Sequence, residues 1–237
     1  MKIVNWNCGG AFRKKIKPII KYRADIYIIQ ECEHPDIFLN TSELKNFRYY
    51  WKGSNKNKGL AIIYNPKYKV DLITLDQTFR NRELKWFLPV SVNDTFDLTA
   101  VWTHKAEAEA FHYIGQFYWL LEKNLSSLKK PIFIGDFNSN TKWDAWDRWW
   151  NHSDIVKILE NGNIISLYHN WMKEEQGSES VKTFYHRKNL DKGYHIDYIF
   201  ADKDFIRTTE NFEYGNIDEW LEFSDHIPLI WSLTIPQ

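Results

Sequence analysis

The sequence predicts an α/β fold in which helices flank two packed central β-sheets. Short apolar or alternating runs, rich in β-branched residues, recur along the 237-residue chain and are typical of strands. A few segments with helical spacing lie between them. No stretch rich in Ser, Gly and Pro divides the chain, and the polar residues of interest come from both ends. We therefore expect residues 1–237 to form one domain.

The predicted strands are recognised by runs such as KIVNW, DIYIIQE, LAIIY and PIFIGD. Their length and their content of Ile, Val and Phe favour strands over helices. In chain order they span 2–6, 25–31, 60–64, 68–75, 87–92, 96–102, 131–136, 163–168, 195–201 and 227–233.

The predicted helices are recognised by apolar residues three and four positions apart. In the first, Ile16, Ile19 and Ile20 share one face and lysines occupy the other. The second has the same spacing over a longer stretch, and the third is short. They span 12–22, 111–128 and 154–160.

Composition and charge exclude several classes of protein. The formal net charge is zero, so no global field draws the chain to nucleic acid or to a membrane, and any polyanion must meet a local basic patch. The two cysteines, Cys8 and Cys32, provide neither a disulfide framework nor zinc-site spacing. No apolar run approaches the roughly 18 residues of a membrane span. We expect a monomeric, cytoplasmic protein with no membrane association.

Polar residues able to bind metal or move protons follow the predicted strands, or lie inside them, along the whole chain. An uncompensated buried charge is costly, so many hard-oxygen ligands at the mouths of core strands indicate a divalent cation among them. The pattern therefore suggests hydrolysis of a phosphate ester. The residues are Asn7, Glu31, His104, Asp136, Asn138, Asp197, Asp225 and His226.

The segment GDFN directly follows the apolar run PIFI. Asp136 and Asn138 are two positions apart, so in an extended segment their side chains face the same way. We expect Gly135 to let the backbone turn close to a ligand. Taken alone, GDFN is equally compatible with an ordinary turn, just as Asp225-His226 alone is compatible with a surface turn.

Together, the motifs resemble those of the endonuclease/exonuclease/phosphatase superfamily, which includes exonuclease III, DNase I, sphingomyelinases and inositol polyphosphate 5-phosphatases. VNWN resembles the opening motif, IIQE the second, GDFN the central one, and IDYIF with SDHIPL the closing pair. The resemblance runs from Lys2 to about Leu233. It implies a four-layer α/β sandwich of the DNase I type, with the active site at one edge of the two sheets.

The resemblance also implies a metal site. Glu31 resembles the main metal carboxylate, Asn7 a ligand or an amide that orients one, and Asp225 a further acidic residue that helps to bind metal. Carboxylate, amide and water oxygens suit Mg²⁺ or Mn²⁺.

Five residues resemble the catalytic group of the family. Asp136 corresponds to the aspartate that activates water or protonates the leaving group, and Asn138 to its partner that orients phosphate and water. His226 corresponds to the histidine that contacts the scissile phosphate, and Asp197 to the carboxylate that orients it. His104 matches a histidine found after the strand before GDFN.

The substrate is less well defined by the sequence. Abasic-site endonucleases of the superfamily carry a tyrosine and asparagine motif where this chain has TAVWTHK, so abasic-site specificity is not expected. Basic residues on loops near the motifs suggest a polyanion, with Arg13, Lys14 and Arg187 as candidate contacts. Trp143, Trp146 and Trp150 lie at helical spacing, so Trp143 belongs either to a helix face packed on the sheet or to an aromatic wall that stacks on bases.

The leading hypothesis is a Mg²⁺- or Mn²⁺-dependent nuclease that cuts phosphodiester bonds in DNA or RNA. The alternative is a metal-dependent phosphatase or phosphodiesterase for a small phosphorylated metabolite or lipid head group. A catalytically inactive binding module on the same fold is disfavoured, because every expected catalytic position is present. The sequence is compatible with endonuclease action and with exonuclease action.

Overall fold

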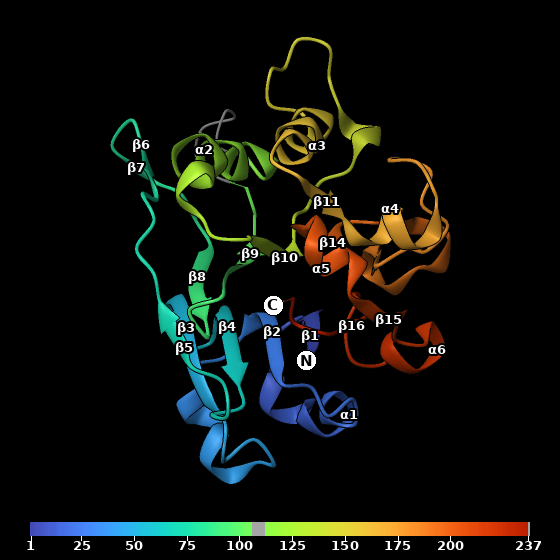
Figure 1. Ribbon diagram of the computed structural model, residues 1–237. Helices are drawn as coiled ribbons and strands as arrows, with labels where there is room; N and C mark the ends of the chain where they lie inside the picture. Colours follow the sequence, from blue (N-terminus) through green and yellow to red (C-terminus); the bar gives the residue numbers. More distant parts are fainter. Residues whose placement is uncertain (106–111, 237) are drawn as a thin grey trace.

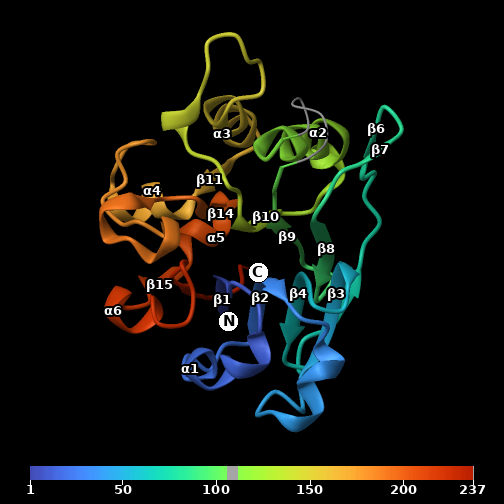
Figure 2. The same ribbon diagram turned by 180° about the vertical axis from the view of Figure 1, so that it is seen from behind.

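The computed structural model describes residues 1–105 and 112–236, and within them two six-stranded mixed sheets lie face to face (Figures 1 and 2). The first sheet has the order β15 (Thr209–Tyr214), β16 (Leu229–Leu233), β1 (Lys2–Asn7), β2 (Ile26–Cys32), β4 (Lys58–Tyr64) and β3 (Arg48–Asn55). The second has the order β11 (Ile164–Ser166), β14 (Asp197–Asp202), β10 (Ile132–Asp136), β9 (Phe96–Trp102), β8 (Phe87–Val92) and β5 (Val70–Leu72). Two short ribbons pair β6 (Thr78–Phe79) with β7 (Arg82–Glu83), and β12 (Phe184–Tyr185) with β13 (Gly193–Tyr194).

Helices cover the outer face of each sheet, which confirms the predicted four-layer α/β sandwich (Figure 1). The first sheet is covered by α1 (Ile16–Ile20) and α6 (Ile217–Trp220), and the second by α2 (Ile114–Asn124) and α3 (His152–Asn161). The short helices α4 (Leu167–Met172) and α5 (Lys203–Arg207) pack beside β14. No helix in the described ranges is long and apolar enough to span a bilayer.

Successive residues of the central strands face different layers, which explains why these strands are apolar throughout. In β1, Ile3 packs between the sheets, whereas Val4 packs against the helices on the outer face. In β10, Ile134 packs between the sheets and Phe133 faces α2 and α3. A strand buried on both faces shows no polar alternation, so a continuous apolar run is its sequence signature.

The helix predicted at 12–22 is wrong in its extent. The structure has a 3₁₀ turn at Phe12–Lys14 and a short helix α1 that begins at Ile16. Pro18 explains the break, because a proline is tolerated in the first turn of a helix but clashes with the preceding turn further along. Helix α3 agrees with the prediction at 154–160. Helix α2 covers part of the predicted 111–128, and its expected first residue, Phe111, lies outside the described residues.

Among the strands, the prediction at 163–168 is partly wrong, since β11 ends at Ser166 and the chain continues as α4. Of the strand predicted at 68–75, only Val70–Leu72 form a strand, β5. In the two large sheets, β3 and β15 were not predicted, because many of their residues are half-buried or exposed and show no apolar run. The four strands of the short ribbons were not predicted either.

The strand directions bring the polar motifs to one edge of the sandwich. β1 and β2 are parallel, and so are β9 and β10, so the carboxyl ends of each pair lie together. β14 runs antiparallel to β10, and β16 antiparallel to β1, so these strands begin where the others end. In register, Asp136 at the end of β10 faces Asp197 at the start of β14.

Candidate active site

A cavity of about 1160 Å³ opens at this edge of the two sheets. Seven of the eight residues singled out at strand ends line it, namely Asn7, Glu31, His104, Asp136, Asn138, Asp225 and His226. The eighth, Asp197, is buried beside them and contacts His226. The structure therefore brings together side chains from both sheets that are far apart in the sequence.

Asn7 and Asp136 join the two sheets at the floor of the cavity. The Asn7 side-chain amide donates a hydrogen bond to Oδ2 of Asp136 over 2.9 Å, and both residues are buried. Oδ1 of Asp136 accepts the backbone N–H of Asn138 over 2.9 Å. Both oxygens of Asp136 are therefore held by donors, which fixes the direction of the carboxyl group.

His226 lies between two buried carboxyl groups. Its Nδ1 is 2.8 Å from Oδ2 of Asp197, and its Nε2 is 4.0 Å from Oδ2 of Asp136. Burial alone would lower the pKa of His226, but the negative charges of Asp197 and Asp136 outweigh it and raise the pKa to about 9. The imidazole is therefore a cation at neutral pH and can contact an anion in the cavity.

Asp136, Asp197 and His226 place ligand-type atoms within 4.8 Å of one another, which is also the geometry of a compact metal site. Nδ1 of His226 is engaged with Asp197, and both oxygens of Asp136 already accept hydrogen bonds. We interpret the group as an imidazolium held between two carboxyl groups. Burial raises the pKa of Asp136 to about 7, with the charge of Asp197 acting in the same direction and His226 opposing it.

Gly135 has a different role from the one expected. With φ of 156° it lies in a conformation that favours glycine, and a Cβ at this position would collide with the backbone carbonyl of Val101 on the neighbouring strand β9. The glycine is required for close packing of β9 and β10 rather than for approach to a ligand.

Glu31 occupies a β-bulge. Along β2, Gln30 pairs with Leu60 and Cys32 with Gly59, so Glu31 is the extra residue, and its φ of 57° lies in the left-handed region. A bulge redirects a side chain that regular pleating would point elsewhere, and Glu31 lines the cavity. Strained backbone at a non-glycine residue is typical of functional sites.

The residues expected to hold a divalent cation fit that role by their chemistry and their position. The carboxylates of Glu31 and Asp225 and the side-chain amide of Asn7 all line the same cavity. They offer hard oxygen donors, and no sulfur donor lines this cavity among the described residues. Oδ1 of Asn7 also accepts the backbone N–H of Gly9 over 3.1 Å, which fixes the orientation of the amide.

His104 forms part of the cavity wall together with Trp86 and Trp102. Its ring centroid is 5.4 Å from that of Trp102, and its Nδ1 is 3.0 Å from the backbone oxygen of Lys105. Burial lowers the pKa of His104, and the charges of Lys85 and Lys58 act in the same direction. We therefore expect a neutral imidazole there, which can exchange hydrogen bonds but adds no positive charge.

The basic residues predicted to contact substrate are not all at the cavity. Arg187 lines it, whereas Arg13 and Lys14 line a separate pocket near α1. Arg13 is ion-paired with the buried Glu33, which gives it a structural partner. The cations on the cavity wall are Lys15, Lys58, Lys105, Arg187 and Lys188.

Of the two alternatives for Trp143, the helix through Trp143, Trp146 and Trp150 is wrong. A 3₁₀ turn ends at Trp143 and the next helix, α3, begins at His152. The side chain of Asn151 explains this, because it exchanges hydrogen bonds with the backbone of Ala145 over 2.9 and 3.0 Å and so closes the intervening loop. Trp150 is buried, whereas Trp146 is 97% exposed.

Trp143 lines a second pocket of about 390 Å³ beside the main cavity. The two pockets share Asn138, Tyr113 and Phe184. The ring centroid of Trp143 is 5.2 Å from that of Tyr194, so aromatic rings form part of the wall. Trp143 is half-exposed and does not belong to the core.

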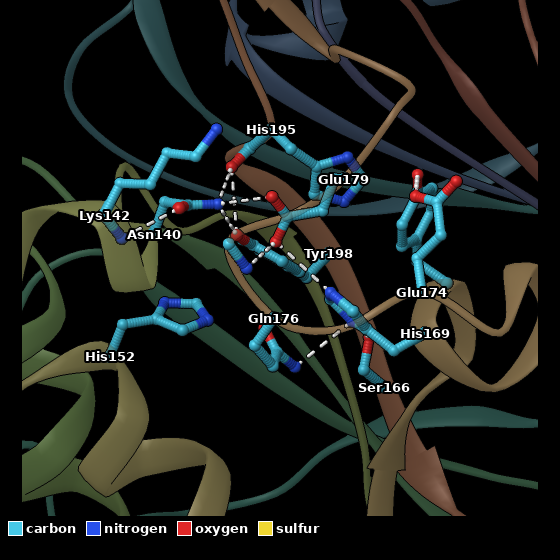
Figure 3. Close-up of polar contacts among 12 residues, drawn as sticks. Asn140, Lys142, His152, Ser166, His169, Glu174, Gln176, Glu179, His195 and Tyr198 are labelled. Atoms are coloured by element: carbon cyan, nitrogen blue, oxygen red, sulfur yellow. Dashed lines mark hydrogen bonds and ion pairs between the residues drawn. The ribbon is translucent and has the colours of Figure 1, made fainter.

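A buried polar network holds the loop that follows Asn138 (Figure 3). The side-chain amide of Asn140 lies 3.1 Å from Oε2 of Glu179 and 3.0 Å from the hydroxyl of Tyr198. Oε1 of Glu179 is 3.2 Å from Nε2 of His169. Hydrogen bonds, led by that of His169, outweigh burial and hold the pKa of Glu179 well below its usual range. Through Asn140, which follows Asn138 by two residues, the network holds the loop after the GDFN motif in place.

Several residues support the site through contacts that spacing along the chain does not reveal, although Ser224 belongs to the SDHIPL motif. Thr183 accepts the backbone N–H of Asp197 over 3.0 Å, and Ser224 donates to the backbone oxygen of Asn7 over 2.8 Å. Phe184 packs against His226, with ring centroids 4.7 Å apart. Their positions depend on long-range contacts, so spacing along the chain does not identify them.

Comparisons with known proteins agree with this architecture. A family model described as Endonuclease/Exonuclease/phosphatase family matches residues 4–226. No curated protein sequence is significantly similar to the chain. Solved structures with the same fold include the 3'-5' exonuclease NExo from Neisseria meningitidis, with 16% identity and a TM-score of 0.73, covering 99% of this chain and 100% of that one.

Two further structures are similar to the same degree. One is a variant of the 3' phosphatase NExo from Neisseria bound to a product DNA hairpin, with 16% identity and a TM-score of 0.72. The other is an AP endonuclease from Archaeoglobus fulgidus, with 18% identity and a TM-score of 0.73. Each covers 99% of this chain and 100% of its own. At these identities the likeness shows a shared fold. Because the family model matches nearly the whole chain, this protein belongs to the endonuclease/exonuclease/phosphatase family.

Proposed function

We propose that this protein is a Mg²⁺- or Mn²⁺-dependent nuclease that hydrolyses phosphodiester bonds of nucleic acid. The observation that carries the proposal is the convergence, in one cavity, of two chemically different groups. His226 with Asp136 and Asn138 forms one group, and the oxygen donors Glu31 and Asp225 form the other, and all five residues line the cavity. Phosphodiester hydrolysis needs both a group that handles protons and a means of neutralising charge on the phosphate.

The chain's own residues divide the reaction between them. The cationic His226, held by Asp197, donates a hydrogen bond from Nε2 to a non-bridging phosphate oxygen. Asp136 accepts a proton from the attacking water or returns one to the leaving oxygen. The Asn138 amide already donates to the backbone oxygen of Thr103 over 2.8 Å, so its orientation is fixed before substrate binds.

A divalent cation held by Glu31 and Asp225, with Asn7 as ligand or orienting amide, would neutralise charge on the phosphate and polarise it. Neutral His104, on the aromatic wall, would exchange a hydrogen bond with the substrate. Neither the cation nor His104 transfers a proton in this scheme, so proton transfer is assigned to Asp136.

The cavity wall favours a polyanion over a neutral substrate. Lys15, Lys105, Arg187 and Lys188 surround the acidic centre although the net charge of the chain is zero. The adjoining pocket with Trp143 and Tyr194 offers rings on which a base can stack. Both features support nucleic acid, and neither separates DNA from RNA.

A second candidate is hydrolysis of a terminal phosphomonoester. Cationic side chains outnumber carboxylates on the cavity wall, which also suits the dianionic charge of a phosphomonoester. One structural neighbour is described as a 3' phosphatase bound to a product DNA hairpin.

Purified protein with Mg²⁺ or Mn²⁺ should be incubated with labelled single-stranded DNA, double-stranded DNA, RNA, a DNA hairpin with a 3' phosphate, and a small phosphomonoester. We expect shortened oligonucleotides. Release of phosphate from the hairpin without shortening would favour the second candidate. Fastest hydrolysis of the small phosphomonoester would contradict a nucleic-acid substrate.

A further inference from the structure

Lys58 and Glu31 form an ion pair inside the cavity. Nζ of Lys58 lies 2.8 Å from Oε2 of Glu31 and 5.6 Å from the ring centroid of Trp102. Both charged side chains line the cavity, and they are 49% and 22% exposed. Glu31, one of the carboxylates proposed to hold a divalent cation, is therefore already paired with a cation of the chain.

The backbone sets this pairing. Lys58 is the first residue of β4, and its neighbour Gly59 pairs with Cys32, directly after the bulged Glu31. The bulge turns Glu31 out of the regular ladder, and the start of β4 brings Lys58 beside it. The register of β2 and β4 therefore places the two side chains next to each other.

A divalent cation at Glu31 and the ammonium group of Lys58 compete for the same carboxylate. Like charges a few ångströms apart repel, and the repulsion is stronger where protein partly replaces water around them. Among the described residues, no second carboxylate is ion-paired with Lys58. Once a cation takes Glu31, the ammonium group needs a new anionic partner, and a phosphate in the same cavity supplies one.

We infer that Lys58 exchanges Glu31 for a phosphate oxygen of the substrate, so that the divalent cation and the phosphate bind cooperatively. The inference rests on the proposed metal-dependent function and adds a coupling between its two ligands. Lys58 weakens binding of the cation when phosphate is absent and strengthens binding of phosphate when the cation is present. Such coupling is reciprocal, so phosphate must raise the affinity for the cation by the same factor.

The test measures Mn²⁺ binding directly, by electron paramagnetic resonance of free Mn²⁺, with and without inorganic phosphate. The variants are Lys58→Met, the charge-conserving Lys58→Arg, and Lys67→Met as a control that breaks an ion pair with Asp25 away from the cavity lining. Unfolding midpoints of all four proteins show whether the fold is intact.

We expect Lys58→Met to bind Mn²⁺ alone about tenfold more tightly than the parent, because one positive charge next to the site is removed. Phosphate should raise the Mn²⁺ affinity of the parent more than that of Lys58→Met. Lys58→Arg and Lys67→Met should behave like the parent. These measurements of Mn²⁺ binding do not require the protein to turn over a substrate.

Equal Mn²⁺ affinity in the parent and in Lys58→Met, or an equal phosphate effect in both, would overturn the inference. If the parent still cleaves nucleic acid only with Mg²⁺ or Mn²⁺, such a result leaves the proposed function standing. A parent protein that binds no Mn²⁺ contradicts the inference and the metal-dependent function together.

Discussion

The side-chain amide of Asn7 donates to Oδ2 of Asp136 across the two sheets, over 2.9 Å. Asn7→Ala removes this donor and leaves a buried carboxyl oxygen with one partner fewer. We expect turnover to fall about a hundredfold, on the scale of a missing positioning or electrostatic group. Stability should fall by about 1–3 kcal/mol, the cost of an unsatisfied buried acceptor. Steady-state kinetics and urea unfolding measure the two effects.

Asn5→Ala is the matched control for this prediction. Asn5 lies on the same strand, is fully buried, and accepts a hydrogen bond from Gln30 over 2.8 Å, but it does not line the cavity. It should lose comparable stability while keeping near-parental turnover. Equal losses of turnover in both variants would mean that the Asn7 effect is structural.

The proposed proton chemistry predicts large effects at Asp136 and His226. Asp136→Asn and His226→Ala should each lower turnover about a hundredfold or more, while substrate binding is better preserved. Asp97→Asn is the control, because Asp97 is a buried aspartate of β9 that accepts the backbone N–H of Lys129 over 2.8 Å, away from the cavity lining. Near-normal rates in both catalytic variants would refute these roles.

The position of the basic residues predicts where nucleic acid is bound. Arg187 and Lys188 line the cavity, whereas Lys14 and Lys17 line the separate pocket near α1. Replacing Arg187 and Lys188 with alanine should weaken binding to all sequences alike, because phosphate contacts carry no base information. The dependence of log affinity on log salt should flatten by roughly 0.7–0.9 for each phosphate that the variant no longer neutralises.

The Lys14 and Lys17 double alanine variant should keep the parental slope, and binding measured over a range of salt concentrations compares the two. If this variant alone flattened the slope, the polyanion would bind near α1, as the sequence first indicated for Arg13 and Lys14.

A pH dependence of stability follows from His152. Burial lowers its pKa from 6.5 to about 4, with Asp144 and Glu179 opposing the shift and His169 adding to it. Between these values the unfolded chain binds a proton that the folded chain does not, so stability falls as the pH drops. His152 alone should contribute a loss of about 2 kcal/mol between about pH 7 and pH 5, whereas Asp136, whose pKa burial raises to about 7, acts in the opposite direction.

Replacing His152 with phenylalanine keeps a ring beside Tyr198 and removes the titrating group. Urea unfolding at both pH values should show a smaller loss of stability than in the parent. Part of the loss should persist, because burial also lowers the pKa of His195 to about 4. An unchanged pH dependence in the variant would contradict a buried neutral His152.

The sequence predicted the central strands well, because strands buried on both faces are apolar throughout. It also predicted the edge at which Asn7, Glu31 and Asp136 meet, since polar residues follow those strands. It did not predict the loop through Trp146, because hydrogen bonds from Asn151 decide that conformation and helical spacing does not reveal them. The pairing of Lys58 with Glu31 depends on a bulge and a neighbouring strand, and sequence spacing contains neither.

Removal of the metal tests the proposed function most directly. Cleavage of a labelled oligonucleotide should be followed in excess EDTA, then after Mg²⁺ or Mn²⁺ is added back, for the parent and for Glu31→Gln, whose amide is isosteric with the carboxylate. We expect cleavage to stop with the chelator and to return with either metal, and Glu31→Gln to require more metal while its unfolding midpoint stays close to the parental one. Full activity of the parent in excess EDTA would contradict a metal-dependent hydrolase at this site.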